Sequence, residues 1–118
     1  AFSPDDKILA VGQGGEIGDA QVHLIDTETG QTIRTVSKHQ YGICDLCFTR
    51  DGQFLITSGR DTTAKVIQVS DGKEIVTLGK PRGGQFKDWL YNICLSPDET
   101  RLAATDIGGL VRVWNLEG

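Results

Sequence analysis

Short apolar runs alternate with polar turns along the whole chain. The clearest unit lies between His39 and Gly72, where apolar runs at residues 43–49, 54–58 and 64–69 are separated by turns rich in aspartate and glycine. These two residue types tolerate the tight turns that join antiparallel strands, and runs of this length fit strands. No stretch has the 3.6-residue period of an amphipathic helix. The pattern therefore predicts an all-β chain of antiparallel strands.

The same unit recurs along the chain at spacings of 46 and 47 residues, which separate Phe2, Phe48 and Leu95. Three positions after each of them a turn carries an aspartate: Asp5, Asp51 and Asp98. The alignment predicts strands at residues 1–3, 8–11, 21–25 and 32–36, then 43–49, 54–58, 64–69 and 74–78, then 90–95, 101–105 and 110–116. Four-stranded antiparallel units repeating every 40–50 residues or so are typical of β-propeller blades.

Throughout its length the chain resembles the WD-repeat family. Residues 111–115 (VRVWN) resemble the sequence that closes this repeat, and residues 24–26 (LID) resemble it with isoleucine in place of tryptophan. Residues 2–5 (FSPD) match the usual end of its innermost strand. The resemblance implies antiparallel four-stranded blades of a β-propeller in an incomplete ring. Blade 1 would span about residues 1–38, blade 2 about 39–80, and blade 3 about 81–118 without its outer strand.

The resemblance also implies a structural hydrogen-bond network. It links a histidine before the innermost strand, a serine or threonine on the second strand, an aspartate in the next turn and a tryptophan on the third strand. In the middle unit His39, Thr57 and Asp61 match, while Ile67 stands in the tryptophan position. In the third unit Trp114 alone matches. We therefore expect a polar trio that serves as scaffolding in the middle blade.

Two segments, residues 12–18 and 79–89, are longer than the repeat requires. The resemblance implies that both insertions emerge on one rim of the propeller, and loops held by a rigid scaffold are common binding sites. The second insertion contains Arg82, Phe86 and Trp89. Tryptophan and arginine are enriched among interface hot spots, so these three residues are candidate partner contacts. In the alternative interpretation, Phe86 and Trp89 fold back and cap the blade.

Other candidate chemistry finds less support. Cys44 and Cys47 form a C-x-x-C pair, but residues three apart on a strand point to opposite faces, which favours packing over metal binding. The glycine-rich residues 12–18 lack the helix that a phosphate-binding loop needs. The three polar residues of the middle unit could form a catalytic set, yet they are the ones the structural network requires. We expect no catalytic residue, no metal and no cofactor.

Composition limits the classes of partner. The 118 residues carry a net charge of −4, so no general field attracts nucleic acid or an anionic membrane. No apolar run approaches the roughly 20 residues of a membrane span. The three cysteines are an odd number, which disfavours a disulfide framework and favours a reducing, cytoplasmic location. The absence of methionine indicates an internal piece of a longer protein.

These observations predict a non-catalytic scaffold for protein–protein interaction, with other proteins or peptides as partners. The alternative is a sensory or regulatory propeller domain in a larger protein that carries, for example, a kinase or protease domain. Three blades cannot close a ring of the usual 4–8 or so. Further blades in the parent chain, or association between copies, are therefore expected.

Overall fold

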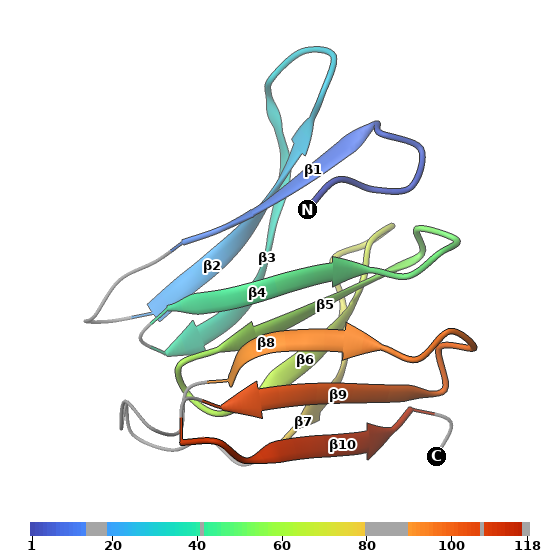
Figure 1. The fold of residues 1–118 in the computed structure, drawn as a ribbon. Coiled ribbons are helices and arrows are strands. Elements are labelled where there is room, and N and C mark those ends of the chain that lie inside the picture. Colours follow the sequence, from blue (N-terminus) through green and yellow to red (C-terminus); the bar gives the residue numbers. More distant parts are fainter. Residues whose placement is uncertain (14–18, 41, 80–89, 107, 117–118) are drawn as a thin grey trace.

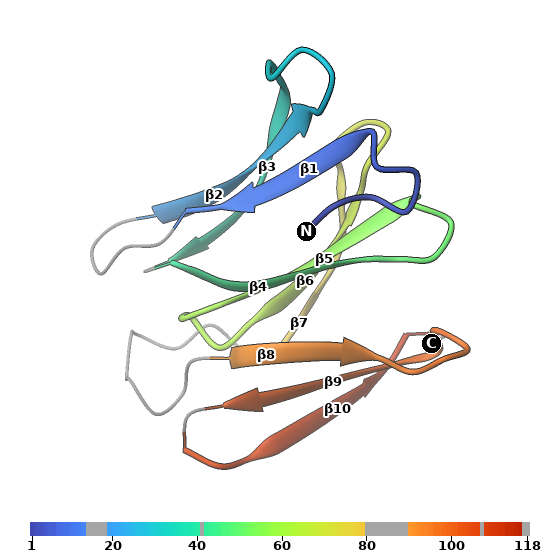
Figure 2. The same cartoon turned by 45° about the horizontal axis from the view of Figure 1, so that its top comes forward.

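A computed structural model describes residues 1–13, 19–40, 42–79, 90–106 and 108–116, and these form three antiparallel sheets. The strands of the first sheet are β1 (Ile8–Gly12), β2 (Asp19–Asp26) and β3 (Thr32–Gln40), in that order. Those of the second are β4 (Ile43–Phe48), β5 (Phe54–Gly59), β6 (Ala64–Gln68) and β7 (Glu74–Leu78). Those of the third are β8 (Leu90–Leu95), β9 (Arg101–Asp106) and β10 (Val111–Asn115). Figures 1 and 2 show the sheets stacked in chain order.

The prediction of antiparallel sheets arranged as propeller blades is confirmed, with the ring left open. The largest departure is β3, which runs four residues past its predicted end at Val36. Its ladder with β2 continues until Asp19 lies opposite Gln40. His39, predicted as the first residue of the middle unit, is therefore part of the first sheet. At the start of the chain, the predicted strand is reduced to a single bridge between Phe2 and Leu9.

Each sheet has two apolar faces, and repeat spacing places equivalent residues on the same face. We call the face directed at the next sheet along the chain the forward face, and the opposite one the rear face. The rear faces carry one paired couple each: Leu9 with Ile25, Leu55 with Ile67, and Leu102 with Trp114. The forward faces carry Ala10, Val22 and Leu24 in the first sheet, Ile56, Ala64 and Val66 in the second, and Ala103, Val111 and Val113 in the third.

The core consists of two layers, each formed by one forward face and one rear face. In the first layer, the forward face of the first sheet packs on Leu55 and Ile67, both fully buried. In the second layer, Ile56 and Ala64 pack with Leu102 of the third sheet, and Trp114 packs against the same cluster. Side chains alternate between the two faces of a strand, so the strands of the middle sheet contribute residues to both layers. The middle sheet is therefore apolar on both faces.

Equivalent turns link the first and second strands of each unit. The Asp51 carboxylate accepts hydrogen bonds from the Thr49 hydroxyl at 2.7 Å and from the Gln53 amide at 3.0 Å. Asp98 accepts from the Ser96 hydroxyl at 2.8 Å in the same way. The recurring aspartates therefore hold turns closed, as expected for short polar side chains that bond nearby backbone groups.

Candidate functional site

A buried polar cluster joins the first sheet to the second. His39 near the end of β3 is fully buried, and its ring contacts residues of β5 and of the β5–β6 turn. Its Nε2 lies 2.7 Å from the Thr57 hydroxyl oxygen, and its Nδ1 lies 3.0 Å from Oδ1 of Asp61. The three residues that the sequence predicted as a trio are thus brought together in the middle of the molecule.

Thr63 is a fourth member of this cluster that the sequence analysis missed. Its hydroxyl donates to Oδ1 of Asp61 at 2.7 Å and lies 3.1 Å from Nδ1 of His39. Its backbone amide donates to the same carboxylate oxygen at 3.1 Å. A threonine two residues after an aspartate could have signalled this, because both can bond across a tight turn. The carboxylate of Asp61 therefore holds the β5–β6 turn as well as the imidazole.

The backbone of the middle sheet is shaped to admit the imidazole. A Cβ atom added to Gly59 would lie 2.6 Å from Cγ and from Nδ1 of His39, which is closer than atoms can approach. Only glycine leaves room for the ring at this point. Gly59, at the end of β5, therefore leaves space for the His39 side chain of the first sheet.

The geometry of the cluster fits a structural role. His39, Thr57 and Thr63 are fully buried, and Asp61 is only 4% exposed, so a substrate has no path to a nucleophile among them. As a carboxylate, Asp61 can only accept, so the Nδ1–H of His39 donates to it and Nε2 can accept from the Thr57 hydroxyl. Each polar group then has a partner, as burial demands.

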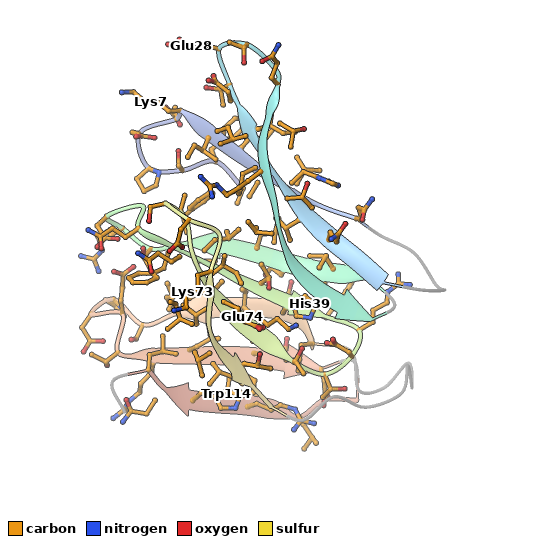
Figure 3. The ribbon with its side chains drawn as sticks, turned by 180° about the vertical axis from the view of Figure 1, so that it is seen from behind. Lys7, Glu28, His39, Lys73, Glu74 and Trp114 are labelled. Atoms are coloured by element: carbon orange, nitrogen blue, oxygen red, sulfur yellow. The ribbon has the colours of Figure 1, made fainter. Side chains whose placement is uncertain are left out.

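Trp114, the fourth residue expected in the network, lies apart from the histidine. It belongs to β10 in the third sheet and packs on the apolar layer between the second and third sheets. Figure 3 shows it separated from His39. Ile67 takes the tryptophan position of the middle sheet and is fully buried in the first apolar layer.

The third sheet closes the corresponding turn with a different aspartate. Asp106 occupies the position equivalent to Gly59, and its Oδ1 accepts from the Leu110 amide at 2.8 Å. Its Oδ2 lies 3.5 Å from a guanidinium nitrogen of Arg112. The sequence analysis missed Asp106 because it stands two positions before the expected site, Gly108.

The candidate partner contacts Arg82, Phe86 and Trp89 lie outside the described residues, as do residues 14–18 of the first insertion. The described residues that follow the second insertion begin with β8, and the starts of β4 and β8 lie at the same edge of their sheets, which we call the rim. Both strands carry a register shift there, at Cys44 and at Tyr91. Tyr91 is 53% exposed.

The thiol of Cys44 lies under this rim and is a poor nucleophile. Burial raises its pKa to about 11, and the nearby Arg60 guanidinium opposes that rise only in part. A thiol reacts as its thiolate, so a high pKa suppresses reaction at neutral pH. The Arg60 amide donates to the carbonyl of Gly42 at 3.1 Å, which ties the β5–β6 turn to the start of β4.

The described residues provide neither a metal centre nor a membrane-spanning helix. No group of three or more histidine, cysteine, aspartate or glutamate side chains in them could hold a metal ion. In the same residues, no helix has the length and apolar character to cross a membrane.

Comparison with known proteins places the chain among repeat proteins. The family model "WD domain, G-beta repeat" matches residues 30–68 and 72–115. Autophagy-related protein 16 of Arabidopsis thaliana is 30% identical over 98 residues, covering 83% of this chain and 19% of that protein. WD repeat and SOCS box-containing protein 1 of Homo sapiens is 27% identical over 117 residues, with 98% and 26% covered. The chain spans about a quarter or less of the length of these relatives.

Solved structures agree on the fold. The β-propeller domain of Cps50 (Swd1) from Myceliophteria thermophila superposes with a TM-score of 0.82 at 21% identity, covering all of this chain and 33% of that chain. Hydrazine synthase of Kuenenia stuttgartiensis superposes with a TM-score of 0.79, also at 21% identity, covering 98% of this chain and 31% of that chain. At this level of identity the likeness concerns architecture alone.

Proposed function

Because this chain belongs to the WD-repeat family and folds as propeller blades, we propose that it is a non-catalytic scaffold that binds proteins or peptides. WD-repeat propellers are in general interaction platforms. This proposal concerns the given chain and not the function of the whole protein, since the chain spans only part of the length of its relatives.

One observation carries the proposal: Tyr91 is an exposed aromatic residue at the rim, and in the sequence it follows the long second insertion by two positions. Tyrosine is among the residue types that dominate interface energetics. The ladder of β8 with β9 resumes directly after it, so the backbone that presents Tyr91 is fixed on a rigid sheet. A partner that binds there has little ordering entropy to overcome on the protein side.

The buried cluster supports the same proposal by its inaccessibility. His39, Thr57 and Asp61 are the residues with the types of a catalytic set, and all three lie below the surface. Their side chains form hydrogen bonds with one another and with the backbone of the β5–β6 turn. Chemistry on a substrate is therefore not expected from them.

The test begins with a peptide selected from a random display library against the chain, whose Kd is measured by calorimetry. Tyr91→Ala should raise that Kd by about tenfold or more, because truncation of a hot-spot aromatic residue weakens binding. A tenfold rise in Kd corresponds to a loss of about 1.4 kcal/mol of binding free energy. Lys73→Ala is the matched control, since Lys73 is exposed in the β6–β7 turn at the opposite ends of the strands. Equal Kd values for the two variants would refute this rim as the binding surface.

Two expectations from the sequence remain proposals. The propeller could serve as a sensory or regulatory domain attached to an enzyme, which sequencing of the flanking regions would decide. Nucleic acid is not proposed as a partner, because the net charge is −4. A cytoplasmic location is proposed from the odd number of cysteines.

A further inference from the structure

Ser58, near the end of β5, links the second sheet to the start of the third. It is fully buried, and its hydroxyl donates a hydrogen bond to the carbonyl oxygen of Leu90 at 3.1 Å. Leu90 is the first residue of β8 and is itself fully buried. Figures 1 and 2 show the end of β5 beside the start of β8. The bond therefore crosses from one blade to the next at the level of the rim.

The acceptor of this bond belongs to the peptide group of Tyr91. The carbonyl of Leu90 and the amide of Tyr91 lie in one planar unit, so a bond that holds the carbonyl also fixes the orientation of the amide. Tyr91 falls in a register shift, where the ladder with β9 passes from Leu90 directly to Asn92. A residue in such a bulge is left out of the ladder, and its side chain is re-aimed. The second sheet therefore supplies a restraint at Tyr91 that the ladder of its own sheet does not.

The first sheet contacts the second at the equivalent position. Gly12 in β1 corresponds to Ser58, because each stands three positions after the leucine of the rear face. A Cβ atom added to Gly12 would lie 2.6 Å from Cγ2 of Ile43, the first residue of β4. Ile43 precedes a register shift, as Leu90 does. One position in each of these two sheets thus contacts the residue that leads into the bulge of the next sheet.

The strand that carries Ser58 is fixed from both sides. Thr57, its neighbour in β5, points to the opposite face and lies 2.7 Å from Nε2 of His39 through its hydroxyl oxygen. Consecutive residues of one strand therefore fasten the middle blade to the blade before it and to the blade after it. The hydroxyl that restrains Tyr91 is thus held on a rigid support.

We propose that Ser58 is a positioning residue for partner binding at the rim: its bond to Leu90 holds the bulge so that Tyr91 is presented in one orientation. This inference rests on the proposed binding role of Tyr91. Ser58 is fully buried and cannot contact a partner itself. A contact residue that is held in place before binding loses less entropy when the partner arrives, so loss of the bond should weaken binding without removing a partner contact.

The first test reads the restraint without a partner, from amide correlation spectra. Ser58→Ala should shift the amide resonances of Tyr91, because the bond polarises the peptide group to which that amide belongs. Thr49→Val is the matched control: it also removes a hydroxyl from the second sheet, but that hydroxyl bonds Asp51 and the Phe54 carbonyl at the opposite ends of the strands. A Tyr91 shift no larger in Ser58→Ala than in Thr49→Val would overturn the proposal.

The second test is a double-mutant cycle on the Kd of the display-selected peptide. Ser58→Ala should raise that Kd by about three- to tenfold, the range expected for the loss of one hydrogen bond. In the Tyr91→Ala background the same substitution should change the Kd by less than about twofold, because the side chain that Ser58 positions is gone. Thr49→Val should leave the Kd unchanged in both backgrounds.

The cycle separates this inference from the proposed function. An equal rise in Kd in both backgrounds would overturn the inference, since it would show that Ser58 acts through general stability and not through Tyr91. An unchanged Kd in Ser58→Ala, with Tyr91→Ala still raising it, would also overturn the inference and leave the binding rim standing. If Tyr91→Ala itself leaves the Kd unchanged, the binding rim is refuted and the positioning role of Ser58 falls with it.

Discussion

Nε2 of His39 lies 2.7 Å from the hydroxyl oxygen of Thr57, although the two residues belong to different sheets. The bond fastens β3, the outer strand of one sheet, to the centre of the next. Asp61 and Thr63 complete the same cluster from the β5–β6 turn. The cluster therefore couples the position of one blade to the turn geometry of its neighbour.

His39→Ala should lower the free energy of unfolding by about 1–3 kcal/mol, because it removes the imidazole that bonds the buried Thr57 hydroxyl and the Asp61 carboxylate. Urea denaturation measures this. His23→Ala is the control, since His23 is only partly buried and contacts Thr35 at an exposed site. Its effect should stay within about 0.5 kcal/mol. Similar losses for both variants would show that the cluster contributes nothing specific.

Two adjacent buried threonines should respond to substitution in opposite directions. Thr62 has a φ of 70°, a left-handed value unfavourable for a β-branched residue, and its hydroxyl has no hydrogen-bond partner among the described residues. The equivalent position in the third sheet is Gly109, with a φ of 93°. Thr62→Gly should therefore raise the free energy of unfolding by about 1 kcal/mol, after allowance for the entropy of glycine.

Thr63→Val provides the matched comparison. Valine keeps the shape of threonine, but it loses the bonds to Asp61 and His39, so stability should fall by about 1–3 kcal/mol. Thermal or urea unfolding of the two variants side by side decides the matter. Destabilisation by Thr62→Gly equal to that of Thr63→Val would mean that the left-handed backbone at position 62 stores no strain.

The sequence could predict the sheets because their signals are local. Aspartate and glycine at fixed spacing mark each turn, so nearly every strand lies within one or two residues of its expected bounds. The extension of β3 to Gln40 could not be read, because ladder bonds to β2 sustain it and the residues beyond Val36 show no apolar alternation. Strand pairing overrides pattern at such ends.

The buried trio could be predicted from its family spacing, whereas two other turn residues, Thr63 and Asp106, could not. Thr63 contributes through hydroxyl geometry that no periodicity encodes. Asp106 closes its turn from a position two residues earlier than in the middle unit. The candidate contacts in residues 80–89 belong to an insertion with no counterpart in the other units, so repeat logic could not place them.

The stability of the chain should fall as the pH drops from 3.8 to about 2. Hydrogen bonds from Ser96 and Thr100 lower the pKa of Asp98 from 3.8 to about 2. A carboxyl with a lower pKa in the folded state contributes stability above its unfolded pKa, and that contribution is lost as the pH falls through the folded pKa. Asp98→Asn should flatten the decline of the urea midpoint over this range. An unchanged slope would contradict the assignment.

Cys44 should react slowly with a thiol reagent while the chain is folded. Its pKa is raised from 9.0 to about 11, so at pH 8 or so the thiolate fraction falls by about 100-fold relative to the unfolded chain. Alkylation is followed by mass spectrometry in a variant that carries Cys47→Ser and Cys94→Ser, with and without urea. Equal rates in the two conditions would show that Cys44 is not shielded.

The most direct measurement of the central claim, that this chain is a binding scaffold, combines the peptide Kd and the Tm of Trp89→Ala. Trp89 lies outside the described residues, and its sequence context predicts a partner contact. If Trp89 is a partner contact, Trp89→Ala should raise the Kd about tenfold or more and leave the Tm unchanged within about 2 °C. Trp114→Ala is the control and should lower the Tm, because Trp114 packs in an apolar layer. If Trp89→Ala instead lowers the Tm by several degrees and leaves the Kd unchanged, Trp89 is a blade cap and the claim fails.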